Sequence, residues 1–308
     1  MTSGARIHHS PRMSLAPYPV QRVTDDLEAA TARHPDKVAL ICGATGAQYT
    51  FGELVTAARR LGRVLQDEGV GVGDRVGIVA TNSPHWAVVF LGTFFAGGIV
   101  TTLNPLYTER EVREQFDDSK PTVVFAVEAT APAVQAVWGD RPGFHLLADV
   151  PDLVAGAAGD VAPVTFDPMT HLAVLPYSSG TTGAPKGVML THHNLTSNVR
   201  QTLGAGLIDG YSVMVDFLPF FHIYGMAVLL LPGLAAGATQ ITMPAFDPTR
   251  FLEIVAEHQA TNLFVVPPAM LALANSQAEI EMPSVKFVMS GAAPLPVTSP
   301  GASPTAST

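Results

Sequence analysis

The 308-residue sequence contains one cysteine and few charged residues, which make up 14% of the chain. A lone thiol cannot form an internal disulfide, so the chain is not a small disulfide-stapled secreted protein, and we expect it in a reducing cytoplasm. We interpret Cys42 as a packed strand residue rather than a nucleophile. Acidic residues outnumber basic ones, 26 to 17, and the resulting net charge of −9 argues against nucleic-acid binding.

The sequence also lacks an uninterrupted apolar run long enough to cross a bilayer. The uncharged stretch 86–104 is split by Gly97-Gly98 and ends at Asn104-Pro105. It therefore predicts a buried helix over 84–96 and a strand over 98–103 rather than a span, and we expect no stable membrane insertion. Residues 1–22 have no apolar segment, which predicts a disordered lead-in instead of a signal peptide.

The most informative stretch is the polar run 177–187, which lies between short apolar strands predicted over 171–176 and 188–190. Its glycines allow backbone N–H groups to approach an anion, its hydroxyl groups donate hydrogen bonds, and its lysine adds positive charge. A Walker loop is excluded, because Lys186 is followed by glycine and a strand follows where a helix is required. An ordinary Ser/Thr/Gly connector is the alternative. The candidate polyphosphate ligands are Ser178, Ser179, Gly180, Thr181, Thr182, Gly183 and Lys186.

Strands and helices alternate along the chain, which is typical of an α/β fold with largely parallel sheets. Helices are predicted over 23–33, 50–68, 108–119, 192–203, 251–258 and 267–274, and further strands over 38–42, 48–50, 75–80, 121–125, 213–218, 262–266 and 285–290. Residues 129–168 indicate surface loops with one or two short elements. We predict a first sub-domain over 23–168, a second over 169–295, and a disordered tail over 296–308.

Histidines occur in two notable places in the second sub-domain. His192 and His193 begin a predicted helix, and we interpret them as surface residues rather than zinc ligands. His222 follows a strand and Pro219 within an aromatic cluster; by itself such a histidine is more often a packed, hydrogen-bonded core residue than a catalyst. No set of residues in the sequence predicts a metal site.

The run YSSGTTGAPKGVMLTHHNL closely resembles the signature loop of the adenylate-forming (AMP-binding) superfamily, which includes acyl-CoA synthetases and 4-coumarate–CoA ligases. The segments LPFFHIYG and SGAAPL resemble two further signatures, so the resemblance covers about residues 23–295. It implies an α/β fold with two flavodoxin-like or Rossmann-like sub-domains with largely parallel sheets, as in the superfamily's N-terminal domain, here incomplete. It further implies that ATP, Mg²⁺ and CoA take part and that the partner is a small-molecule carboxylic acid.

The resemblance also assigns roles to residues. Lys186 and the loop from Ser178 would hold the β- and γ-phosphates, and Lys186 and His222 are the candidate catalytic residues. His222 would border the substrate carboxylate. The pocket for adenosine and the acyl group would be lined by Tyr224, Gly291, Ala292 and Ala293.

The sequence departs from the superfamily pattern after Leu295, where it becomes uncharged and aperiodic. The motifs for Mg²⁺ and ribose, and the mobile C-terminal domain with its lysine, are not among these residues. Ala245 also stands where coumarate ligases carry a lysine associated with CoA. We therefore expect a carboxylate–CoA ligase whose adenylation is impaired, with a non-catalytic nucleotide- or acyl-binding remnant or pseudoenzyme as the alternative. Whether a separate chain supplies the other half stays open.

Overall fold

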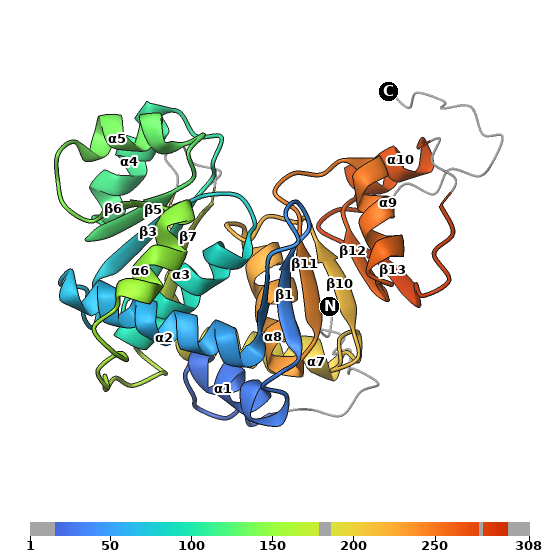
Figure 1. Cartoon of the computed structure of the whole chain (residues 1–308), viewed down its shortest axis with the longest axis horizontal. Coiled ribbons are helices and arrows are strands. Elements are labelled where there is room, and N and C mark those ends of the chain that lie inside the picture. The colour runs from blue at the N-terminus through green and yellow to red at the C-terminus, as the bar shows by residue number, and fades with distance from the viewer. Residues whose placement is uncertain (1–15, 179–185, 277–279, 295–308) are drawn as a thin grey trace, which may run out of the picture.

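The computed structural model describes residues 16–178, 186–276 and 280–294. Two largely parallel sheets with helices packed on them form the body of the molecule (Figure 1). This architecture confirms the predicted α/β fold class. Most of the predicted lead-in and the predicted tail, residues 1–15 and 295–308, lie outside the described residues, as do residues 179–185 of the polar loop.

The first sheet has the strand order β6-β5-β3-β4-β7-β8, with β9 also paired to β7. Its strands are β3 (Arg75–Val79), β4 (Ile99–Leu103), β5 (Val123–Ala126), β6 (Phe144–Leu146), β7 (Leu172–Ser178), β8 (Lys186–Gly187) and β9 (Leu190–Thr191). All pairs are parallel except those that β8 and β9 make with β7. Its associated helices are α2 (Phe51–Asp67), α3 (Pro84–Ala96), α4 (Glu109–Ser119), α5 (Ala131–Trp138) and α6 (Val150–Gly156).

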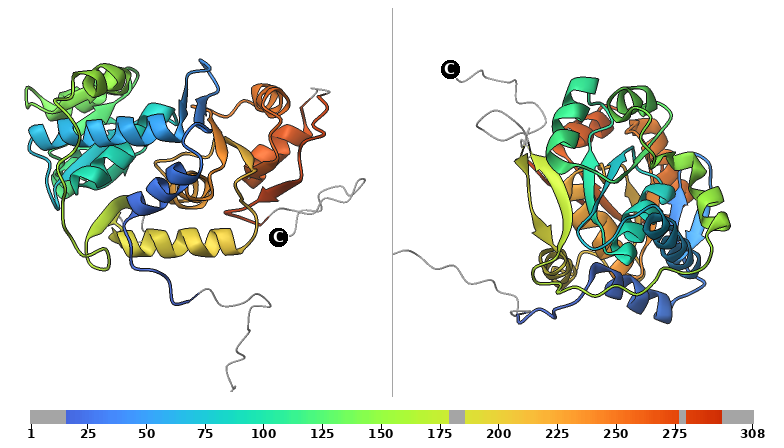
Figure 2. Two further views of the ribbon diagram at one scale, coloured as in Figure 1. Left: turned by 60° about the horizontal axis from the view of Figure 1, so that its bottom comes forward. Right: turned by 90° about the vertical axis from the view of Figure 1, so that its left-hand side faces the viewer.

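The second sheet has the order β13-β12-β10-β11-β1-β2, and only β1 and β2 pair antiparallel among its described strands. Its strands are β1 (Val38–Cys42), β2 (Gln48–Thr50), β10 (Val213–Asp216), β11 (Thr239–Thr242), β12 (Asn262–Val265) and β13 (Phe287–Ser290). The remaining helices are α1 (Val23–Arg33), α7 (His192–Gly204), a π-helical turn (Gly225–Leu230), α8 (Leu231–Ala236), α9 (Pro248–Glu257) and α10 (Pro267–Ala274). Figure 2 shows α7 lying alongside α1, where Arg200 pairs with Asp26.

Each sheet contains strands from both sides of the boundary predicted at residue 168. Strands β1 and β2, from the predicted first sub-domain, belong to the second sheet, whereas β7 from the predicted second sub-domain belongs to the first. The pairing of Leu40 with Gln240 joins segments about 200 residues apart. The two sheets therefore do not correspond to two contiguous stretches of the chain. Local sequence patterns could not predict this, because they carry no information on which distant strands pair.

Helix α2 illustrates how local signals and packing agree. Thr50 and Glu53 form the predicted capping box: the Glu53 N–H donates to the Thr50 hydroxyl at 3.2 Å, and the Thr50 N–H donates to the Glu53 carboxylate at 2.8 Å. The helix crosses α3 at Gly62 and Gly92, where a Cβ on Gly92 would lie 3.0 Å from the Ala58 carbonyl oxygen. Small residues permit this close crossing, which buries the apolar faces of both helices.

Two predictions about the chain were wrong. Residues 129–168 contain α5, β6, a 3₁₀ turn (Leu147–Asp149) and α6, not one or two short elements. His192 is fully buried rather than on the surface, because its ring stacks on Phe166 with centroids 4.9 Å apart, and His171 and Phe94 also pack against it. Phe166 and His171, which precede β7, cover the His192 ring. No sequence pattern around His192 predicts this packing.

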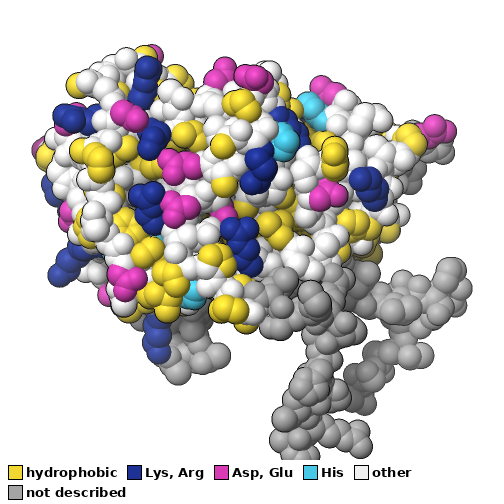
Figure 3. Space-filling model, turned by 90° about the horizontal axis from the view of Figure 1, so that it is seen from below, with side chains coloured by type: hydrophobic (Ala, Val, Ile, Leu, Met, Phe, Trp, Pro, Cys, Tyr) yellow, Lys and Arg dark blue, Asp and Glu magenta, His cyan; other side chains and the backbone are white. Residues whose placement is uncertain are grey.

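The surface is mixed in charge on the face drawn in Figure 3, where basic and acidic side chains are interspersed rather than gathered by sign. Oppositely charged side chains also pair in the described part of the chain, as Arg59 does with Glu28 at 3.2 Å and Arg63 with Asp67 at 2.8 Å. Within the described ranges, no helix is both long and apolar enough to cross a membrane.

Candidate active site

The polar loop connects two strands whose ends the structure places side by side. Ser178 at the end of β7 and Lys186 at the start of β8 are direct cross-strand partners. The candidates between them, Ser179, Gly180, Thr181, Thr182 and Gly183, lie outside the described residues. Because β7 is paired in parallel with β4, the loop leaves the sheet at its carboxyl edge, where open α/β sheets bind ligands.

Lys186 lines a cavity of about 560 Å³ between β7, β8 and α4. Among its described lining residues, Lys186 carries the positive charge, and the carboxylates come from Glu111, Glu114, Asp117 and Asp118. The Tyr177 hydroxyl donates a hydrogen bond to the Asp118 carboxylate. Burial, followed by this hydrogen bond, raises the pKa of Tyr177 well above its ordinary value, so the phenol stays neutral and joins β7 to α4.

A second cavity, of about 500 Å³, brings Ser178 and His222 together. It shares Tyr107 and Tyr177 with the cavity beside Lys186, so the two adjoin. The sequence predicted Ser178 and His222 as parts of separate motifs, 44 positions apart by their numbering. Their convergence on one cavity is the main geometric finding about the site.

The orientation of His222 follows from a main-chain hydrogen bond. The Tyr224 N–H donates to Nδ1 of His222 at 3.1 Å, so Nδ1 acts as an acceptor. In the neutral ring the proton then resides on Nε2, which becomes a donor. The His222 side chain is exposed and lines the cavity that it shares with Ser178.

The segment that carries His222 is held by Asn82, in the loop after β3, and by Thr102, in β4. The buried Asn82 amide donates to the carbonyl oxygens of Asp216 and Leu218, both at 2.9 Å, and accepts from the Phe220 N–H at 2.7 Å. The Thr102 hydroxyl donates to the Phe221 carbonyl at 2.8 Å. Sequence reasoning missed Asn82, because it stands beside Ser83, the N-cap of α3, and looks like an ordinary turn residue.

The backbone after His222 turns sharply into the π-helical turn. A Cβ added at Gly225 would lie 2.2 Å from the Pro219 carbonyl oxygen, a distance that no side chain tolerates. Glycine is therefore required at position 225, because the backbone there passes so close to the Pro219 carbonyl oxygen.

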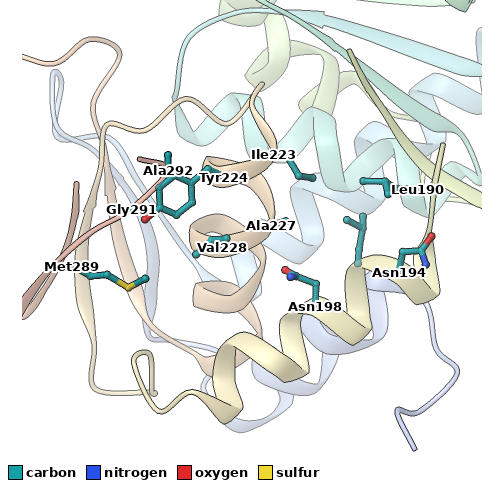
Figure 4. Close-up of a pocket in the computed structure, with 11 residues that line it drawn as sticks. Leu190, Asn194, Asn198, Ile223, Tyr224, Ala227, Val228, Met289, Gly291 and Ala292 are labelled. Atoms are coloured by element: carbon teal, nitrogen blue, oxygen red, sulfur yellow. The ribbon is translucent and has the colours of Figure 1, made fainter. Parts of the chain in front are cut away.

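A third cavity, of about 530 Å³, contains most of the predicted acyl-pocket residues (Figure 4). Its wall is formed by Leu190, Asn194, Leu195, Asn198, Ile223, Tyr224, Ala227, Val228, Met289, Gly291 and Ala292. Leu190 and Ile223 also line the His222 cavity, so the two adjoin. Gly291 faces the Tyr224 ring, since a Cβ there would lie 2.6 Å from the hydroxyl oxygen. Ala293 is exposed and is not among the described lining residues.

One ionisable group beneath the site was not predicted. Asp216 ends β10 and is fully buried, and neither carboxyl oxygen has a hydrogen-bond partner among the described residues. Burial raises the pKa of this carboxyl to about 8, so it is protonated at neutral pH. A single acidic residue inside the apolar run Val213–Phe217 was the signal that could have identified it.

The described part of the chain has no metal centre built from its own side chains. No group of three or more His, Cys, Asp or Glu side chains there is arranged to hold a metal ion. The carboxylates beside Lys186 therefore do not make a protein-based metal centre by themselves.

Comparison with known proteins gives a consistent result. Residues 27–300 match the family of AMP-binding enzymes. The chain is 36% identical to 4-coumarate–CoA ligase 5 of Oryza sativa subsp. japonica over 276 residues, which cover 84% of this chain and 50% of the ligase. It is 30% identical to the long-chain-fatty-acid–CoA ligase of Bacillus subtilis (strain 168), covering 91% and 57%.

A solved structure supports the same likeness. The ATP-bound crystal structure of MatB from Rhodopseudomonas palustris superposes with a TM-score of 0.78 at 30% identity, covering 89% of this chain and 56% of that one. The chain thus spans about half the length of the curated relatives it matches.

Proposed function

The chain belongs to the AMP-binding enzyme family, and from this we propose that it activates a carboxylic acid with ATP, the first step of a carboxylate–CoA ligase reaction. The observation that carries the proposal is the shared cavity of Ser178 and His222. One residue stands at the start of the phosphate loop, and the other presents a donor suited to a carboxylate.

In the proposed reaction, a carboxylate oxygen of the substrate forms a bond to the α-phosphorus of ATP. The bond from that phosphorus to the bridging oxygen breaks, and pyrophosphate leaves with the electron pair. Positioning and charge stabilisation supply most of the catalysis of such transfers. We assign the β- and γ-phosphates to Lys186 and to the loop residues Ser178, Ser179, Gly180, Thr181, Thr182 and Gly183. Lys186 would offset the charge of the departing pyrophosphate.

We assign His222 to the carboxylate. Its Nε2–H would hold one carboxylate oxygen while the other attacks, a role that needs orientation rather than proton transfer. Tyr224, Gly291 and Ala292 would line the acyl pocket, and Ala293 would lie at its rim. The described residues of that cavity carry no charge, which favours a substrate with a neutral acyl group over a dicarboxylic acid.

The second half-reaction, attack of the CoA thiol on the acyl adenylate with release of AMP, belongs to the same proposal. CoA rests on the family likeness alone, and Ala245 offers no charge to it. Mg²⁺ rests on the same likeness. The described residues do not build a metal site, so we place Mg²⁺ with the phosphates of the nucleotide and assign no step to it.

Carboxylate-dependent exchange of labelled pyrophosphate into ATP tests the proposal. The chain is incubated with ATP, Mg²⁺, labelled pyrophosphate and a panel of aromatic and aliphatic acids, beside the Lys186→Ala and Lys286→Ala variants. We expect exchange that requires an acid, is lost in Lys186→Ala and is retained in Lys286→Ala, whose lysine does not line the described cavities. Nucleotide binding without any exchange would favour the non-catalytic alternative.

A further inference from the structure

The Tyr177 side chain connects helix α4 to the two strands that flank the candidate phosphate loop. Tyr177 belongs to β7, directly before Ser178, and it pairs with Gly187 of β8. Its hydroxyl donates to the Asp118 carboxylate of α4. A Cβ added at Gly187 would lie 3.1 Å from the Cζ atom of Tyr177, so the main chain of β8 passes close to the phenol. The same ring therefore contacts the strand that carries Lys186 and, through its hydroxyl, the helix.

Helix α4 is itself fixed to the first sheet. The buried Gln115 amide donates to the Thr101 hydroxyl and to the Thr102 carbonyl oxygen, both at 3.1 Å, and both acceptors belong to β4. At the end of the helix, the Arg75 guanidinium of β3 donates to the Ser119 carbonyl oxygen at 2.8 Å. The carboxylate that accepts the phenol hydroxyl thus stands on a helix tied to two strands of the sheet.

Strand β8 is short and stands at one end of the described strand order. It comprises Lys186 and Gly187, and directly after it the Val188 N–H donates to the Pro176 carbonyl oxygen at 2.8 Å. The side chains of Val188 and Met189 are exposed. A short edge strand with exposed side chains belongs to the parts of a fold that open most easily. A side-chain anchor beside it therefore has a large effect on its order.

We propose that Tyr177 is a positioning residue that places Lys186 for the phosphates by anchoring β8 to α4 through Asp118. The inference rests on the proposed function, which assigns Lys186 to the β- and γ-phosphates. Burial, followed by the hydrogen bond to Asp118, raises the pKa of Tyr177 above its ordinary value, so the phenol keeps the proton that it donates. A strand that is already held in place loses less conformational freedom when the nucleotide binds, so ATP binds more tightly.

The charge of Asp118 by itself predicts the opposite effect. Asp117 and Asp118 both line the cavity beside Lys186, and both are exposed. Each carboxylate repels a polyphosphate, so removing either charge should tighten ATP binding slightly if charge alone matters. Asp118 also accepts the Tyr177 hydroxyl, so anchoring predicts weaker binding when Asp118 is removed. The two neighbouring residues thus separate anchoring from charge by the direction of the change.

Calorimetric titration with ATP and Mg²⁺, and amide hydrogen exchange without nucleotide, test the inference on the full chain. The variants that break the anchor are Tyr177→Phe, Asp118→Ala and the two combined. Asp118→Asn keeps an oxygen that can accept the hydroxyl and is the conservative rescue. The controls are Asp117→Ala, which removes a charge from the same cavity wall, and Tyr211→Phe, which removes the hydroxyl of an exposed tyrosine.

We expect Tyr177→Phe and Asp118→Ala each to weaken ATP binding about fivefold, the effect of one net hydrogen bond. The combined variant should lose no more than either alone, because both changes break the same contact. Asp118→Asn should recover most of the affinity. Tyr211→Phe should match the wild type, and Asp117→Ala should bind ATP as well or slightly more tightly. Without nucleotide, the Val188 amide should exchange about fivefold faster in Tyr177→Phe.

Unchanged ATP affinity or unchanged exchange of the Val188 amide in Tyr177→Phe overturns the inference, as does an equal loss of affinity in Asp117→Ala. If Tyr177→Phe does not fold, Asp118→Ala decides by the same two measurements. Affinity that depends on Tyr177 without any acid-dependent pyrophosphate exchange would overturn the proposed function alone. A folded wild-type chain that does not bind ATP would overturn both.

Discussion

The Tyr224 main-chain N–H donates to Nδ1 of His222 at 3.1 Å, which leaves Nε2 as the donor of the neutral ring, and His222 lines the cavity shared with Ser178. Two residues of the acyl-pocket segment are thereby coupled. The backbone of Tyr224 determines which nitrogen of the neutral His222 ring carries the proton, and the Tyr224 side chain lines the adjoining cavity.

Replacing His222 by alanine should weaken adenylation far more than nucleotide binding. Loss of one positioned donor at a site of developing charge costs about 10²–10³ in rate. We expect a fall of that size in acid-dependent pyrophosphate exchange, with the dissociation constant for ATP changed less than threefold. The exposed His34 is the control, and His34→Ala should leave exchange unaltered. Equal losses in both variants, or loss of ATP binding in His222→Ala, would contradict this role.

Gly225 tests the geometry of the His222 loop. An alanine there would place its Cβ 2.2 Å from the Pro219 carbonyl oxygen, so the backbone must move, and we expect a loss of about 2–4 kcal/mol in unfolding free energy. Gly156 is the matched control because a Cβ there meets nothing within 4 Å, and Gly156→Ala in α6 should be neutral or slightly stabilising. Denaturant unfolding of both variants measures the difference. A Gly225→Ala variant as stable as the wild type would show that the loop is not so closely packed.

His192 should make the fold sensitive to acid. Burial, then the charges of His171 and Arg22, lower the pKa of His192 to about 3. The folded chain keeps the ring neutral, whereas the unfolded ring takes up a proton below about 6.5. Stability is therefore lost as the pH falls from about 6.5 toward 3, by about 2 kcal/mol between pH 7 and pH 5.

The variant His192→Phe keeps an aromatic ring against Phe166 but cannot be protonated. Its unfolding free energy should fall less steeply with acid than that of the wild type, by about the same 2 kcal/mol between pH 7 and pH 5. Parallel curves for the two proteins would show that His192 is not the group responsible.

Asp216 should make the folded chain less stable as the pH rises, which is the opposite of the effect of His192. Because burial raises its pKa to about 8, the folded chain holds a proton that the unfolded chain releases above about 3.8. Its effect is most favourable below pH 3.8, and stability is lost as the pH rises toward 8. Asp216→Asn should therefore exceed the wild type in unfolding free energy at pH 8, on the order of 2–4 kcal/mol, with the gap closing near pH 4. A gap that does not change with pH would contradict the assignment.

Local signals in the sequence were sufficient for most elements and for the motifs of the site. The capping box of Thr50 and Glu53 placed α2, and the strand that ends before Pro219 placed His222 beyond it. Two features depended on distant partners and could not be read locally. The pairing of β1 with β11 decides sheet membership, and the stacking of Phe166 on His192 decides burial.

The same distinction applies to the candidate functional residues. Ser178, His222, Tyr224 and Gly291 were predicted from motifs, and the structure places them on two adjoining cavities. Asn82 acts through three main-chain groups that lie more than 130 positions away, a property that has no local pattern.

We propose a nucleotide site that begins at Ser178 and Lys186 and adjoins the cavity lined by His222. Calorimetric titration of the 308-residue chain with ATP, with and without Mg²⁺, beside Lys186→Ala, tests it most directly. We predict saturable binding by the wild-type chain and at least a tenfold loss in the variant. A folded wild-type chain that does not bind ATP, or a variant that binds it equally well, would contradict the assignment of the loop to the phosphates.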